Sequence, residues 1–272
     1  VGCHENRNSA PPINGPARAL ALQRPPSKLD GWYGAPRFFS YEREVQPVFD
    51  KYCIECHDYG KSAADKLILA GDPDLVFNAS YNELLRKGLI HVVGAGPAQV
   101  QSAFSWGSHA SKLVKRIQEN YHLDAESFDR IVTWLDLNAP YYPSYGSAYP
   151  DNPGGRSPLS AGEVARLTEL TGIKFVDYLD WAKALGPQIS FARPDLSPCL
   201  AGLSDRSPGA YQEALAIIRT GGERLAQRPH PYDDPAQLCA TDQEREKKYQ
   251  ARRAIELANR EAVRSGTKRY DQ

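Results

Sequence analysis

Residues 40–57 read SYEREVQPVFDKYCIECH and end on the pentapeptide CIECH at residues 53–57. Two thiols separated by two residues can add to the two vinyl groups of a protoporphyrin, and the imidazole that follows can then bind the iron. The motif therefore predicts a covalently attached haem c. Cys53 and Cys56 would be its attachment points, and His57 would be the proximal ligand of the iron.

Three other interpretations of CIECH are a thioredoxin-type dithiol, half of a zinc site, and chance. A thioredoxin-type dithiol opens a helix after a strand, whereas apolar residues at helical spacing predict a helix over residues 44–52, with Pro47 in its first turn. A structural zinc site usually adds a second Cys or His pair, and the next cysteine along the chain is Cys199. The sequence therefore favours haem over the alternatives.

The pair Cys3-His4 resembles the second half of the same motif. Val1 and Gly2 would be its two spacer residues, and a cysteine before Val1 would complete it. We therefore expect a second haem held by Cys3 with His4 as its ligand, in a chain that is a fragment of a longer precursor. The alternative is an accidental pair near the end of the sequence.

The charges of the 272-residue chain balance, with 33 Lys plus Arg and 33 Asp plus Glu. This balance does not favour nucleic acid or an anionic membrane as a partner. No apolar run reaches about 18 residues, so no transmembrane segment is expected. The 21 glycines and 21 prolines predict long, turn-rich connections between modest helices.

Five cysteines and no methionine are present. Haem attachment to thiols takes place outside the bacterial cytoplasm, so a periplasmic or other extracytoplasmic location is expected, where disulfides also form. Three cysteines are assigned to haem, which leaves Cys199 and Cys239 as a candidate disulfide or as two unrelated thiols.

The absence of methionine excludes His/Met ligation of any haem here. In a small class I cytochrome the sixth ligand lies on the loop before the last helix, and here that loop holds His122. We therefore prefer His122 as the sixth ligand, ahead of His109. His91 and His230 are expected to be ordinary polar residues.

The expected fold is mainly α: a class I-like cytochrome c module with long irregular loops, followed by a helical C-terminal extension. Residues 1–39 would form an N-terminal haem-binding wrap at the end of an upstream haem domain, residues 40–142 the cytochrome c domain, and residues 143–272 the extension. Ser108 and Asp124 are the expected N-caps of two helices, and short extended pieces are expected around residues 67–69 and 75–77. Helices are predicted over residues 44–52, 81–87, 108–118, 124–137, 160–171, 177–185, 209–227 and 241–265.

Residues 40–57 resemble the cytochrome c module of planctomycete multidomain proteins. A longer set of motifs is similar to the C-terminal dihaem region of proteins related to the hydrazine synthase alpha subunit. This set comprises GCHENR at residues 2–7, GSHAS at 107–111, WLDLNAP at 134–140 and NPGGR at 152–156.

The resemblance implies a dihaem c-type segment downstream of other domains and exported from the cytoplasm. In hydrazine synthase one such haem is catalytic, and the other, with two histidine ligands, passes electrons. The catalytic haem iron of that enzyme has a tyrosine four residues after the proximal histidine, where this chain has Asn8. This departure does not favour hydrazine chemistry here.

The sequence therefore predicts a c-type dihaem segment that performs one-electron transfer in an exported redox protein. Its partners would be a redox protein and the other subunits of a larger assembly. One alternative is a haem oxidoreductase acting on small nitrogen compounds. Another is a scaffolding subunit whose haems serve as relays.

Overall fold

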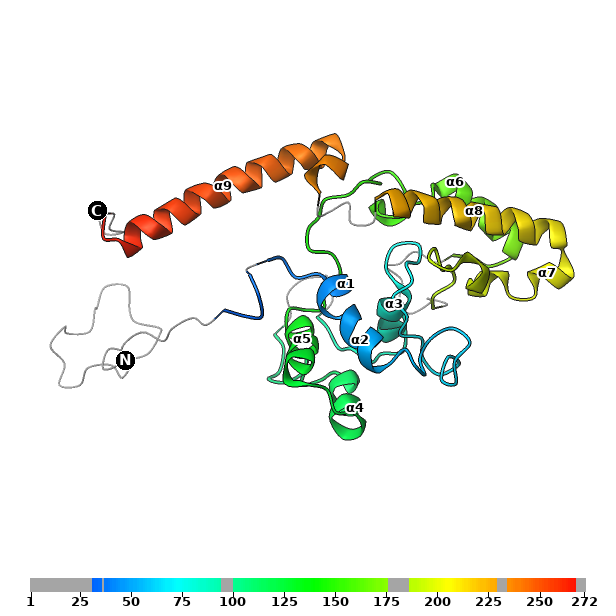
Figure 1. Cartoon of the computed structure of the whole chain (residues 1–272), viewed down its shortest axis with the longest axis horizontal. Helices are drawn as coiled ribbons and strands as arrows, with labels where there is room; N and C mark the ends of the chain where they lie inside the picture. The colour runs from blue at the N-terminus through cyan, green and yellow to red at the C-terminus, as the bar shows by residue number, and fades with distance from the viewer. Residues whose placement is uncertain (1–30, 36, 94–99, 176–185, 229–233, 268–272) are drawn as a thin grey trace. The chain divides into compact units, whose positions relative to one another are not determined.

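The computed structural model describes residues 31–35, 37–93, 100–175, 186–228 and 234–267 (Figure 1). Contacts divide the chain into two units, Val1–Arg37 and Phe38–Gln272. In the first unit, the rings of Trp32 and Tyr33 meet edge to face, and the Arg37 guanidinium lies 5.2 Å from the centre of the Trp32 ring. All the sites discussed below lie in the second unit.

Five α-helices form the part of the second unit that surrounds the CIECH motif. A break at Val45 separates the first two helices, and Pro47 lies in the first turn of the second. The break suits proline, which has no backbone N–H to donate and tolerates the first turn of a helix. The helices are α1 (Tyr41–Glu44), α2 (Gln46–Tyr52), α3 (Ala79–Arg86), α4 (Lys112–Asn120) and α5 (Ala125–Asp136).

Aromatic side chains from α1, α3 and α5 form the centre of this first core. The ring of Tyr41 lies 5.0 Å from that of Trp134 and stacks on that of Tyr141 at 5.4 Å. The backbone N–H of Tyr41 also donates to the carbonyl oxygen of Tyr141 at 3.0 Å. The start and the end of this region are thus joined, and α1 packs against both α2 and α5 (Figure 1).

A second hydrophobic core lies further along the chain, where α6 and α8 pack side by side (Figure 1). Gly221 on α8 allows Phe191 to pack closely, because a Cβ atom on Gly221 would lie 2.3 Å from the Phe191 ring. The elements of this region are η2 (Pro153–Gly155), α6 (Ala161–Thr171), η4 (Pro194–Leu196), η5 (Pro198–Leu200), α7 (Leu203–Arg206), α8 (Pro208–Gln227), η6 (Pro235–Gln237) and α9 (Ala240–Arg264).

The loop over residues 70–78 joins the two cores. Leu75 packs against the second core, and Phe191 donates its backbone N–H to the carbonyl oxygen of Pro73 at 3.0 Å. The Asp74 carboxylate accepts the backbone N–H groups of Gln188 and Ile189. Hydrogen bonds therefore join residues that lie more than 110 positions apart in the sequence.

The expectation of a mainly helical fold is confirmed: the described residues contain helices and no strand, with one isolated bridge between Pro73 and Asn78. The extended pieces expected around residues 67–69 and 75–77 do not form strands. The helix predicted over residues 177–185 lies outside the described residues. No helix in the described part of the chain is both long and apolar enough to cross a bilayer.

One predicted N-cap is right and the other is wrong. Asp124 caps α5, accepting the backbone N–H of Ser127 at 2.8 Å. The helix expected to begin at Ser108 begins instead at Lys112, with Ser111 as its N-cap. The backbone N–H and the hydroxyl of Ser108 donate to the Asp136 carboxylate, which draws this residue into a turn against the end of α5.

Candidate haem site

The CIECH motif forms a tight turn that continues directly from α2. Cys53 still donates its backbone N–H to Phe49 at 2.8 Å, and His57 donates its own to the carbonyl oxygen of Cys53 at 2.9 Å. Cys53 is half-buried and Cys56 is exposed. Burial raises the pKa of the Cys53 thiol to about 11. The turn thus presents both thiols and the imidazole within five residues.

A cavity of about 520 Å³ lies against this turn, and both Cys53 and His57 line it. Most of its wall is apolar and comes from α2, α4, α5 and the segment before α3. A volume of this size falls in the range of cofactor and ligand pockets. The apolar lining residues are Val48, Phe49, Leu67, Leu69, Leu89, Leu113, Ile117, Leu123 and Ile131.

The imidazole of His57 is held by a backbone carbonyl. Its Nδ1 lies 2.9 Å from the carbonyl oxygen of Leu67. A carbonyl oxygen only accepts hydrogen bonds, so this contact requires the proton on Nδ1 and leaves the lone pair of Nε2 for a metal. A second bond, from the backbone N–H of Leu69 to the carbonyl oxygen of His57 at 2.7 Å, fixes the same segment. Metal-binding histidines commonly have such an Nδ1–H bond.

Three cations, Lys66, Lys87 and Arg116, also line the cavity. All three are exposed, and none forms an ion pair with another described residue. They can therefore pair with the carboxylates of a bound ligand at the cavity edge. One thiol of the attachment pair, an imidazole with the required tautomer, an apolar wall and cations at the rim together fit the chemistry of a covalent haem, whereas Cys56 is not part of the wall.

Neither predicted sixth ligand lines this cavity. His122 is exposed, although the residues on either side of it, Tyr121 and Leu123, are both in the wall. His109 is also exposed and packs its ring against Phe104, with the ring centres 4.6 Å apart. The assignment of His122, and that of His109 behind it, therefore stay predictions. Tyr121 lines the cavity but was not among the predicted site residues, although its position next to the candidate ligand His122 could have indicated it.

Three of the remaining predicted residues lie outside the described part of the chain, and the other three do not line this cavity. Cys3 and His4 lie outside the described residues, as does His230, and His91 is exposed. Cys199 and Cys239 are both free thiols. Cys199 is buried in the second core, whereas Cys239 is the N-cap of α9 and its thiol lies 3.3 Å from Asp242. The structure thus does not join the candidate disulfide pair.

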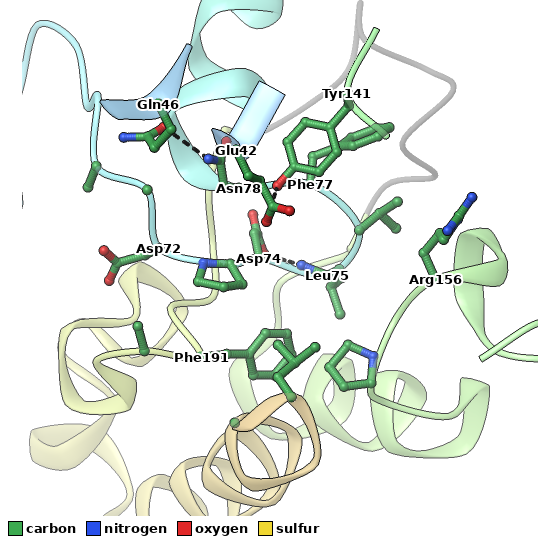
Figure 2. Close-up of a pocket in the computed structure, with 18 of the residues that line it drawn as sticks. Glu42, Gln46, Asp72, Asp74, Leu75, Phe77, Asn78, Tyr141, Arg156 and Phe191 are labelled. Carbon is green, nitrogen blue, oxygen red and sulfur yellow. Dashed lines mark hydrogen bonds between the residues drawn. The ribbon is translucent and has the colours of Figure 1, made fainter. Parts of the chain in front are cut away.

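A second and larger cavity, of about 890 Å³, lies between the two cores (Figure 2). Its wall includes Ile54 and Asp58, so it borders the CIECH turn as well. Figure 2 shows Phe77 and Tyr141 on one side of the cavity and Phe191 on the other, with Asp72 and Asp74 on the loop between them. The lining thus combines five aromatic rings and five carboxylates with two arginines, Arg156 and Arg193.

Asp74 is the most perturbed carboxyl group of this second cavity. It is buried, and this burial raises its pKa from the ordinary 3.8 to about 6, against the opposing effect of the N–H groups of Leu75, Gln188 and Ile189 that it accepts. Asp50, at another point of the wall, also has its pKa raised by burial. Both groups would be stabilised by a positive charge in the cavity.

Within the described residues, no group of three or more His, Cys, Asp and Glu side chains is arranged to hold a metal ion. Comparisons with protein families, curated proteins and solved structures found no match to this chain.

Proposed function

We propose that residues 40–142 hold a haem covalently on Cys53 and Cys56, with His57 as the proximal ligand, and that the protein transfers single electrons. The observation that carries the proposal is the His57 ring, which lines a cavity of about 520 Å³ and has its Nδ1 bound to the Leu67 carbonyl oxygen. When bound, the haem supplies an iron that alternates between the ferrous and ferric states.

The residues of the chain have distinct parts in this function. The apolar wall would exclude water from the iron, and the Leu67 carbonyl oxygen fixes the tautomer and orientation of His57. Lys66, Lys87 and Arg116 would balance the negative charge of the haem propionates. The packing of α1 against α5, the helix that follows the His122 loop, also supports a class I-like arrangement.

The reduction potential tests this proposal. With no methionine in the sequence, the sixth position is taken by histidine, by a rarer ligand or by none, and His/Met ligation is the arrangement that raises the potential. We therefore expect a redox titration to give a midpoint potential below that of Met-ligated cytochromes c. A strongly positive midpoint would count against the proposal.

The alternative of a haem oxidoreductase acting on small nitrogen compounds is favoured by one observation. The cavity of about 890 Å³ borders the CIECH turn at Ile54 and Asp58. Its aromatic rings, and the carboxylates that do not pair with Arg193, among them Asp74, suit small cationic molecules. An enzyme of this kind needs an open coordination position on one iron. Spectra of the reduced protein with and without carbon monoxide or nitric oxide separate the two functions, because pure electron transfer predicts no ligand-induced shift.

We propose further that the protein works in an extracytoplasmic compartment with a redox partner protein, within a larger assembly, and that Cys3 and His4 hold a second haem. The scaffolding alternative assigns partner binding to residues 143–272. A chain ending near residue 150 that keeps the native haem spectrum but no longer assembles would favour scaffolding.

A further inference from the structure

The side chain of Arg193 binds two carboxylates at once. Its two terminal nitrogens donate to Asp58, at 2.9 Å to Oδ2 and 2.6 Å to Oδ1. The same guanidinium donates to Asp72, from Nε to Oδ2 at 2.8 Å and from a terminal nitrogen to Oδ1 at 2.6 Å. Arg193 is 135 residues from Asp58 in the sequence and 121 residues from Asp72. One side chain of the C-terminal region thus reaches the motif region in two places.

The two carboxylates stand at the two ends of one loop, residues 58–72. Asp58 directly follows His57, and the loop contains Leu67, whose carbonyl oxygen accepts the Nδ1–H of His57. Asp72 closes the other end and also accepts the hydroxyl of Ser190. Arg193 therefore closes the loop that orients the proposed proximal ligand.

The cluster is shielded enough from water for its charges to matter. The exposed fractions of the side chains are 36% for Arg193, 17% for Asp58 and 8% for Asp72. The Arg193 guanidinium also lies 5.2 Å from the centre of the Tyr59 ring. Paired guanidinium–carboxylate bonds of this geometry restrict both partners more than a single ammonium contact does.

We infer that Arg193 is a positioning residue of the haem site. It holds the 58–72 loop in the shape that keeps Leu67 on His57, and it balances the negative charge of Asp58 and Asp72 beside the proximal ligand. The inference rests on the proposed function, and it makes the C-terminal region part of the haem site.

Four variants of the haem-loaded chain test this inference: R193M, R193K, D58N and the control R166M. Arg166 makes an equally short paired bond with Glu213, at 2.7 and 2.9 Å, on an exposed surface of α6 and α8. The readouts are the midpoint potential and the electron paramagnetic resonance spectrum of the ferric protein, which reports the orientation of the axial imidazole.

Loss of the cation in R193M leaves two carboxylates unbalanced, which stabilises the ferric state, so the midpoint shifts down and the resonance lines shift and broaden. D58N removes a negative charge, so its midpoint shifts up. R193K restores the charge but cannot bind both carboxylates in a planar fork, so its midpoint returns toward the wild-type value while its lines stay broadened. R166M changes neither readout. A general loss of packing would not move R193M and D58N in opposite directions.

Haem-loaded R193M and R193K with the potential and spectrum of the wild type overturn this inference, as does R166M with the changes expected for R193M. If R193M is not recovered with haem, R193K and D58N decide by the same criteria. The mass of the wild-type chain distinguishes a failure of the proposed function from a failure of this inference alone. A wild type without covalent haem on Cys53 and Cys56 overturns the proposed function and this inference with it, whereas a loaded wild type with unresponsive variants overturns this inference alone.

Discussion

At the scale of single residues, the proposed haem site depends on one tight turn. The hydrogen bonds of residues 53–57 form this turn, and the carbonyl oxygen of Leu67 holds the imidazole of His57. Single substitutions at the two cysteines of the turn therefore test the site directly.

The two thiols are expected to contribute separately. In C53S or C56S one thioether remains, so the α-band of the haem spectrum in alkaline pyridine should shift toward that of a haem with one free vinyl group. C199S removes a buried thiol of the second core and serves as the control, with an unshifted band. A band unchanged in both C53S and C56S would contradict attachment at this motif.

The sixth ligand is tested by comparing H122A with H109A. Both residues flanking His122 line the cavity, so the loop that carries His122 borders it, whereas neither residue flanking His109 lines it. We therefore expect reduced H122A, unlike the wild type, to bind carbon monoxide, and H109A to behave as the wild type. Carbon monoxide binding by H109A alone would assign the ligand to His109.

Asp74 makes the free energy of unfolding depend on pH. Its pKa is about 6 in the folded protein and near 3.8 in the unfolded chain, so the folded state binds more protons between these values. The contribution of Asp74 to the free energy of unfolding therefore falls as the pH rises from about 4 to 6 and is constant above. D74N should remove this contribution, as measured by urea unfolding across that range.

The matched control for D74N is E163Q. Hydrogen bonds from Arg224 lower the pKa of Glu163 to about 2, so its stabilising contribution is present above the ordinary 4.5 and is lost as the pH falls toward 2. E163Q should change the pH dependence of the free energy of unfolding only below about pH 4.5. If the free energy of unfolding of D74N depended on pH between 4 and 6 as steeply as that of the wild type, the pKa of Asp74 would not be raised.

At the scale of elements, the sequence predicts an N-cap correctly where the capping side chain bonds to the helix that it begins. Asp124 caps α5, as predicted, and Asn138, with a backbone φ of 68°, follows the C-cap residue Leu137 close to the predicted end of the helix. Ser108 failed as a cap because its groups bind Asp136, which lies 28 residues away. Gly107, with a φ of 70°, permits that approach, since a Cβ there would lie 2.6 Å from the Asp136 carboxylate.

Asp124 also anchors the loop that carries His122. Besides capping α5, its carboxylate accepts the hydroxyl of Tyr52 at 2.6 Å and the ammonium of Lys51 at 2.9 Å, both at the end of α2. D124A should lower the free energy of unfolding, because it removes an N-cap, and should also alter the haem spectrum. Urea unfolding and absorption spectra measure the two effects.

S160A is the comparison variant for D124A. Ser160 caps α6 in a capping box with Glu163, within the second core. Its loss should also lower the free energy of unfolding, by about 1 kcal/mol, without changing the haem spectrum. If both variants, or neither, changed the spectrum, the link from Asp124 to the cavity would be wrong.

At the scale of the whole molecule, the sequence did not predict the contacts between the two cores. The sequence predicts a boundary in the tract of tyrosine, proline, glycine and serine after residue 140, and residue patterns suggest two independent regions. Arg193, Asp58 and Asp72 lie too far apart along the chain for any local pattern to pair them. The larger cavity, lined by both regions, was hidden for the same reason.

The mass of the intact chain, expressed in a host that attaches haem c, tests the central claim most directly. We expect the mass of the polypeptide plus one haem, with peptide mapping placing the haem on Cys53 and Cys56. A second haem would be present where the chain also carries the cysteine that completes the motif at Cys3. A chain with the mass of the polypeptide alone, or with haem that dissociates on unfolding, would contradict the claim.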